Sequence, residues 1–200
     1  VVAPHTQPRI FPQTILEFLK KRTRKLDAVV ISGGEPTLQD KLFHFAKEIK
    51  ALQYKIKLDT NGSNPKVVEQ LYSEGLIDCI GIDWKAPRHK YRKMTGEHVP
   101  ENIAEIVYKT ISFAVDKNLH MDIRTTVHKE LLSEEDLKTM KNELQDIGVK
   151  EWTLQQFHHA DLIDDSLKDK ETYSDHELAK FAKQLGNNTK VRGINVSVSK

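Results

Sequence analysis

The stretch VISGGEPT, residues 30–37, joins the end of an apolar segment to the start of a polar one. Paired glycines, Gly33 and Gly34, let the main chain turn tightly and let a ligand approach it without a Cβ in the way. Pro36 suits the first turn of a following helix. The stretch predicts a strand, a turn and a helix in succession, although a Gly-Gly turn taken alone is more often only a turn.

The same rhythm continues along the chain. From Phe11 onward, strand-like and helical segments alternate with short breaks, which is typical of parallel βα units. We expect strands over residues 28–32, 54–59, 77–83, 120–127, 151–157 and 191–198. This α/β pattern fits a partial barrel or an open doubly wound sheet, and the rhythm does not decide between them.

The intervals between these strands carry helix signals. Apolar residues recur at three- and four-residue steps from Leu38 to Leu52 and predict a helix that lies on the sheet. Ser133 is placed as an N-cap and Gly148 as the end of its helix, while Ser174 and Glu177 have the spacing of a capping box. Further helices are expected over residues 65–74 and 103–114.

Composition sets bounds on the class of protein. The chain has 200 residues and a net charge of +2 from 31 basic and 29 acidic residues, so nothing favours nucleic acid or an anionic membrane surface as a partner. We expect a single domain over residues 1–200 in a soluble, cytoplasmic protein without a membrane span. The single cysteine, Cys79, excludes an internal disulfide and predicts an inert buried thiol.

Polar side chains gather in and after the strands. Ligands bind at the carboxyl ends of parallel strands, where Asp59, Thr60, Asp83 and Lys85 stand. Two-residue alternation also places Lys57 with Asp59, Asp122 with Arg124 and Thr126, and Gln156 with His158 on one face of their strands. They line either a polar lumen or a rim that faces water. For Lys57 and Arg124, pairing with Asp59 and Asp122 is favoured over contact with a ligand.

The order of the strand ends carries a resemblance. Residues 30–36 (VISGGEP), 57–65 (KLDTNGSNP), 83–85 (DWK) and 154–158 (LQQFH) follow one another as in radical S-adenosylmethionine (SAM) enzymes of the glycyl-radical-activating type. The chain resembles the pyruvate formate-lyase activating enzymes and, more closely, the anaerobic ribonucleotide reductase activating proteins. The likeness runs from about Leu16 to Ser166, the motif-bearing core.

The resemblance implies a partial (β/α)6 TIM-like barrel whose first strand and cluster loop are missing from this sequence. It implies SAM contacts that suit the ammonium, carboxylate and ribose of that ligand. The SAM-binding residues would be Gly33, Gly34, Glu35 and Asp59 for the amino group, Lys85 for the carboxylate and His158 for the ribose. A monovalent cation would be held by Asp59, Thr60 and Asp83.

The sequence departs from the family at its amino end. There a CxxxCxxC loop normally supplies the thiolates of a [4Fe-4S] cluster and precedes a His-Asn-Pro-like segment, a place that His5 to Pro8 could take. Val1 and Pro4 stand where cysteines are expected, and Cys79 cannot replace the missing loop. We therefore expect the cluster only if the full chain carries cysteines upstream.

The resemblance implies an oxidoreductase that cleaves SAM reductively and generates a glycyl radical on a partner such as an anaerobic ribonucleotide reductase. Its electron donor would be a flavodoxin or a ferredoxin. A cluster-free pseudoenzyme that binds SAM or a protein partner is the alternative. A third reading is an ordinary barrel enzyme that performs acid–base chemistry with His158, Asp83 and Lys85.

Overall fold

A computed structural model of the protein describes residues 10–96, 98–158, 167 and 169–194. Its centre is one six-stranded sheet in which all neighbouring strands are parallel. The strands are β1 (Ala28–Ile31), β2 (Lys55–Thr60), β3 (Cys79–Asp83), β4 (His120–Val127), β5 (Trp152–Gln156) and β6 (Thr189–Arg192).

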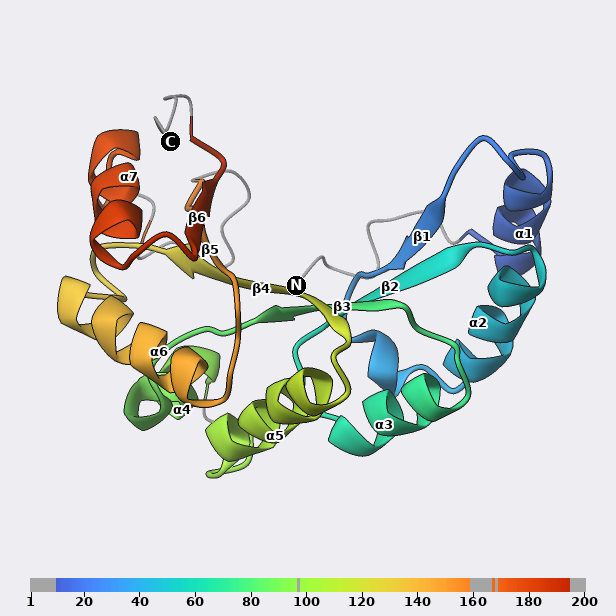
Figure 1. The fold of residues 1–200 in the computed structure, drawn as a ribbon, viewed down its shortest axis with the longest axis horizontal. Coiled ribbons are helices and arrows are strands. Elements are labelled where there is room, and N and C mark those ends of the chain that lie inside the picture. The colour runs from blue at the N-terminus through green and yellow to red at the C-terminus, as the bar shows by residue number, and fades with distance from the viewer. Residues whose placement is uncertain (1–9, 97, 159–166, 168, 195–200) are drawn as a thin grey trace.

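The order of the strands in the sheet is their order in the chain, β1 to β6. Right-handed connections that always step in one direction place every helix on the same face of the sheet. Figure 1 shows this arrangement, with the sheet curved into an arc and the helices along its convex side. A doubly wound sheet would reverse direction at a switch point. The fold is therefore the partial barrel.

The helices begin and end largely where their local signals stand. They are α1 (Pro12–Lys20), the 3₁₀ turn η1 (Pro36–Leu38), α2 (Leu42–Ala51), α3 (Pro65–Ser73), α4 (Arg88–Thr95), α5 (Ile103–Asp116), α6 (Glu134–Asp146) and α7 (Asp175–Gln184). Ser133 is the N-cap of α6, as predicted, and it also forms a capping box with Asp136, while the predicted capping box of Ser174 and Glu177 is complete. No helix in the described part of the chain is long and apolar enough to cross a bilayer.

Two helix predictions were inaccurate. Leu38 was expected to begin the apolar stripe, but it lies in η1 with 68% of its surface exposed, and α2 starts at Leu42. α4 was not predicted, because its sequence RHKYRKMT is almost entirely polar and buries only Tyr91. A single buried ring gives no periodic signal.

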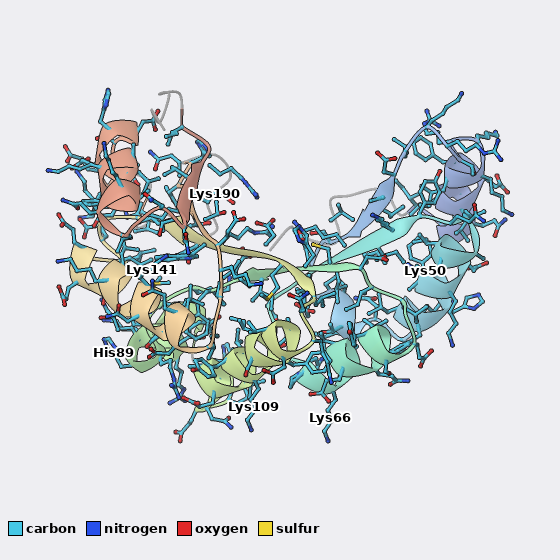
Figure 2. The ribbon with its side chains drawn as sticks, in the orientation of Figure 1. Lys50, Lys66, His89, Lys109, Lys141 and Lys190 are labelled. Atoms are coloured by element: carbon cyan, nitrogen blue, oxygen red, sulfur yellow. The ribbon has the colours of Figure 1, made fainter. Side chains whose placement is uncertain are left out.

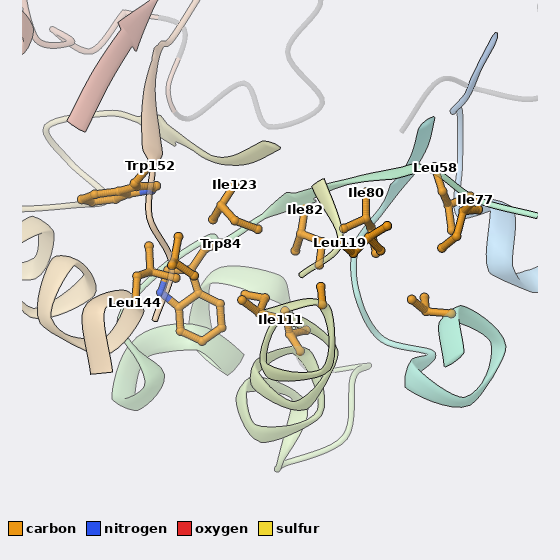
Figure 3. Close-up of a cluster of buried hydrophobic side chains, with 14 of the residues drawn as sticks. Leu58, Ile77, Ile80, Ile82, Trp84, Ile111, Leu119, Ile123, Leu144 and Trp152 are labelled. Carbon is orange, nitrogen blue, oxygen red and sulfur yellow. The ribbon is translucent and has the colours of Figure 1, made fainter. Parts of the chain in front are cut away.

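The main core lies between the sheet and the helices. Figure 3 shows Leu58, Ile80, Ile82 and Ile123 of β2, β3 and β4 on the helix side of the sheet, the side on which Ile111 of α5 also lies. All five side chains are at most 1% exposed. Side chains alternate along a strand, so the residues between them face the concave side of the sheet.

The register corrects one prediction about the concave side. Gln156 is paired with Val127, and its amide donates a hydrogen bond to the carbonyl oxygen of Tyr173 at 2.7 Å, so it faces the helices. Gln155, aligned with Thr126 and Arg192, takes the concave position instead. The last strand also starts two residues earlier than predicted, and residues 195–198 of that prediction lie outside the described residues.

Candidate functional site

The turn after β1 presents bare main chain. Gly33 and Gly34 have φ angles of +96° and +58°, a region that glycine enters without strain. Both are exposed, and no atom lies within 4 Å of the place where a Cβ would stand. The turn therefore leaves the backbone open to a ligand, as the sequence predicted.

The Glu35 carboxylate accepts hydrogen bonds from other groups of the protein. Oε1 accepts hydrogen bonds from the Thr37 backbone N–H at 3.1 Å and from the hydroxyls of Thr37 and Thr60, each at 2.6 Å. Oε2 accepts from the backbone N–H of Asn61 at 2.7 Å. A carboxylate offers about four acceptor positions, and four donors meet this one. Glu35 therefore ties the end of β1 to the end of β2.

Asp59 stands near the middle of the concave face and depends on a glycine beside it. Asp59 is aligned with Gly81 of β3, where a Cβ would lie only 2.3 Å from Asp59 Oδ1. Oδ1 is buried and makes no hydrogen bond within the described residues, but it lies 3.2 Å from Lys57 Nζ. This oxygen is therefore covered by the protein and faces the Lys57 ammonium.

Arg124 of β4 connects two carboxylates. Its Nε lies 2.6 Å from Asp83 Oδ1, and its Nη2 lies 3.2 Å from Asp59 Oδ2. Burial lowers the pKa of the guanidinium, but Asp83 and Asp59 outweigh that effect and raise it above its ordinary value. Asp83 is thus paired with Arg124 across the two strands.

The remaining charges of this face centre on Asp122. Its Oδ2 lies 2.6 Å from Lys57 Nζ, and its Oδ1 lies 3.3 Å from Nη2 of Arg192 on β6. Burial raises the pKa of Asp122, yet Lys57, Arg192 and Arg124 together lower it below its usual range. For Lys57, burial lowers the pKa, and Asp122 with Asp59 raises it. Internal pairing of Lys57 and Arg124 is confirmed.

The other predicted site residues lie at the same edge of the sheet. Lys85 is exposed two residues after β3, and His158 is exposed two residues after β5. Thr60 does not join the aspartates, because its hydroxyl donates to Glu35 and accepts from the backbone N–H of Gly62 at 3.1 Å. The structure thus joins Asp59 and Asp83 through Arg124 and leaves Thr60 apart.

Two residues of this face were not singled out from the sequence. Gly81 stands between apolar residues in β3, and a glycine inside a strand often marks a close approach of another group. That signal could have found it. Arg192 gave none, because its side chain reaches from β6 to Asp122 on β4, 70 positions away in the sequence and with β5 between them.

The single cysteine of this sequence does not provide the ligands of an iron–sulfur cluster. Cys79 lies at the start of β3, the opposite end from the Asp83 and Lys85 positions, and it is only partly buried. Burial is the main cause that raises the pKa of its thiol. One cysteine cannot supply the thiolates of such a cluster. The segment from His5 to Pro8 lies outside the described residues.

A pocket of ≈ 450 Å³ lies beside the Gly-Gly turn, away from the charged residues. Ser32 and Gly33 form part of its wall, whereas Asp59, Asp83 and Arg124 do not. Its lining consists of Pro12, Ile31, Ser32, Gly33, Pro36, Gln39, Asp40, Lys41, Leu42 and Phe45.

Comparison with known proteins gives consistent results. A sequence profile described as "Radical SAM superfamily" matches residues 4–140. A protein of Methanocaldococcus jannaschii named "Putative glycyl-radical enzyme activating enzyme" is 34% identical over 174 residues, which cover 84% of this chain and 72% of that protein.

Solved structures show the same fold. SuiB of Streptococcus suis bound to S-adenosylmethionine superimposes with a TM-score of 0.72 at 14% identity, over 94% of this chain and 45% of that one. A domain of a pyruvate-formate lyase-activating enzyme from Bacteroides vulgatus gives a TM-score of 0.62 at 19% identity, over 84% of this chain and 100% of that one. The chain thus spans less than half of SuiB and all of the Bacteroides domain.

Proposed function

Because the chain belongs to the radical SAM superfamily, we propose that it binds SAM at the carboxyl ends of β1, β2, β3 and β5. We propose further that it is the SAM-binding part of an activating enzyme, which cleaves SAM reductively and generates a glycyl radical on a partner enzyme. The observation that carries this second step is the 34% identity, over 84% of the chain, to a relative whose name describes an activating enzyme for glycyl-radical enzymes.

The geometry supports SAM binding through complementary groups. SAM carries an ammonium and a carboxylate on its amino acid part, which require acceptors and a cation. The Asp59 carboxylate is proposed as an acceptor, the open main chain of Gly33 and Gly34 provides acceptors and donors, and the exposed Lys85 provides the cation. His158 is assigned to the ribose.

Glu35 takes a positioning role in this proposal. Three of its four protein donors meet Oε1, so only Oε2, which accepts one hydrogen bond, keeps an acceptor position for the SAM ammonium. By fixing Thr37, Thr60 and Asn61, it holds the Gly-Gly turn against the end of β2. Contact with SAM at this turn is therefore assigned to the main chain of Gly33 and Gly34 and to Oε2 of Glu35.

Isothermal titration calorimetry with SAM tests the binding step. We expect saturable binding, and affinity at least about tenfold weaker for methylthioadenosine, which lacks the amino acid part. Lys85→Met is expected to weaken SAM binding by a similar factor. Lys66→Met is the matched control, because Lys66 lies on α3 and points away from the sheet (Figure 2). No heat of binding from SAM would contradict the proposal.

The activating step is tested in a polypeptide that contains this chain together with a cluster-binding cysteine loop. After anaerobic reconstitution, we expect 5′-deoxyadenosine to be released and a glycyl radical to appear on the partner by electron paramagnetic resonance. Failure to form either product would contradict it.

A cluster-free binding module is the second candidate, and the single cysteine of this sequence favours it. Such a protein binds SAM or a protein partner without turnover. Retained SAM affinity in a natural full-length product that holds no iron and releases no 5′-deoxyadenosine would support this candidate over the first.

A further inference from the structure

The space between Asp59 and Asp83 holds a protein cation. Both aspartates belong to the predicted monovalent cation site, and the Arg124 guanidinium lies between them at 3.2 Å and 2.6 Å. β2, β3 and β4 are neighbours in the middle of the sheet, so three adjacent strands contribute one residue each (Figure 1). The Arg124 side chain is only 18% exposed.

The third predicted ligand of that ion is turned away. The Thr60 hydroxyl lies 2.6 Å from Glu35 Oε1 and is buried on the helix side of the strand end. The residues present therefore do not fit the monovalent cation site that the family resemblance implies. Two of its ligands are paired with a guanidinium, and the third bonds another residue.

We infer that Arg124 takes the place of the monovalent cation and that this protein holds Asp59 and Asp83 for SAM without Na⁺ or K⁺. The inference rests on the proposed SAM binding. A guanidinium is planar and makes directed bonds to two carboxylates at once, so it orients them more rigidly than a mobile ion.

The charge balance of the concave face supports this reading. Asp59, Asp83 and Asp122 are matched by three cations, namely Lys57, Arg124 and Arg192. An additional metal cation would enter a cluster that is already neutral and would be repelled by Arg124.

The test compares SAM affinity in sodium, potassium and choline chloride at equal ionic strength. Choline is too large to occupy a sodium site between two carboxylates. For the wild-type chain we expect dissociation constants that agree within about twofold across the three salts. For Arg124→Gln we expect binding at least about tenfold weaker in choline than in wild type, with partial recovery in Na⁺ or K⁺.

Arg192→Gln is the matched control, because it removes a guanidinium from the same face but leaves the Asp59–Arg124–Asp83 contacts in place. We expect no difference between the salts for it. Arg124→Lys keeps the charge and serves as a second variant if Arg124→Gln does not fold. Wild-type affinity about tenfold tighter in Na⁺ or K⁺ than in choline would overturn the inference while leaving SAM binding intact.

A ²³Na resonance linewidth titration decides the inference independently of SAM. Wild type is expected to broaden the sodium signal no more than Asp59→Asn does, while Arg124→Gln gains saturable broadening. Saturable broadening by wild type that Asp59→Asn abolishes would overturn the inference. Absence of SAM binding in every salt would instead contradict the proposed function.

Discussion

The hydroxyl of Thr60 lies 2.6 Å from Oε1 of Glu35, and this hydrogen bond fastens the end of β2 to the end of β1. The residue that precedes each of these two in the sequence belongs to the candidate site. Gly34 precedes Glu35 in the open turn, and Asp59 precedes Thr60 on the concave face. The pair therefore sets the spacing between the main-chain and carboxylate parts of the site.

Replacing Thr60 with Val tests this link at nearly constant side-chain volume. The change removes a donor to Glu35 and an acceptor for the Gly62 N–H, so we expect unfolding in urea to cost about 1–3 kcal/mol less free energy than in wild type. SAM affinity is expected to fall as well. Thr126→Val, at an exposed position of β4, is expected to change stability by no more than about 0.5 kcal/mol.

Gly81→Ala tests how closely Asp59 and Lys57 approach β3. The added methyl group would stand 2.3 Å from Asp59 Oδ1 and 3.1 Å from Lys57 Cε, so both side chains must move. We expect a loss of about 1–3 kcal/mol in unfolding free energy and weaker SAM binding in calorimetry. Cys79→Ala, on the same face of the same strand, is the control. A Gly81→Ala protein with wild-type SAM affinity would show that Asp59 plays no part in the ligand site.

Local signals account for the parts of the fold that the sequence predicts well. The N-cap at Ser133 and the capping box at Ser174 depend only on residues within one turn of the chain, and both form. β4 has the predicted bounds because its buried residues alternate in sequence. α4 was missed because its stability depends on contacts that it makes in the fold: Tyr91 packs on Trp84, and Arg88 bonds Glu105 of α5.

The candidate site could be predicted only in part, because its pairs join distant strands. Lys57 pairs with Asp122 and Arg124 with Asp59, contacts that depend on strand register. Alternation placed Lys57 with Asp59, and Asp122 with Arg124, on one face of their own strands, but it could not fix which side chains pair between the strands. The sequence pattern also placed Gln156 on the wrong face of the sheet. Gln156 is paired with Val127 and faces the helices, although it is polar.

The capping box of α7 predicts an acid-sensitive helix start. Hydrogen bonds from the N–H and hydroxyl of Ser174, with the ammonium of Lys129 nearby, lower the pKa of Glu177 to about 2. The unfolded value is about 4.3, so this stabilisation is fully present above that pH and is lost as the pH falls toward about 2. Carbon-13 NMR titration of the Glu177 carboxyl measures it directly.

Ser174→Ala provides the matching stability measurement. At pH 7 we expect a loss of about 1 kcal/mol in unfolding free energy, and the difference from wild type should shrink in acid. Ser73→Ala removes a hydroxyl at the C-terminal end of α3 and is expected to change the unfolding free energy little. A Glu177 pKa near the unfolded value would show that the box does not form in solution.

Lys141 of α6 predicts stability that increases with pH. Its side chain is 6% exposed, and its ammonium donates to the Thr189 hydroxyl at 3.1 Å. Burial lowers the pKa of Lys141. Between this lowered value and the unfolded value of about 10.4, the unfolded chain binds more protons, so stability rises with pH through that window. Below the folded-state pKa the full cost of burying the charge is present.

Lys141→Met removes this cost and keeps a long, flexible apolar side chain. We expect the variant to be more stable than wild type at pH 7, by on the order of 1 kcal/mol in urea unfolding, and to lose part of the rise in stability toward pH 10. Lys138→Met, on the exposed side of the same helix, is the control and should show neither effect. If Lys141→Met were clearly less stable at pH 7, the bond to Thr189 would outweigh the burial of the ammonium, and α6 would depend on that charge to hold β6.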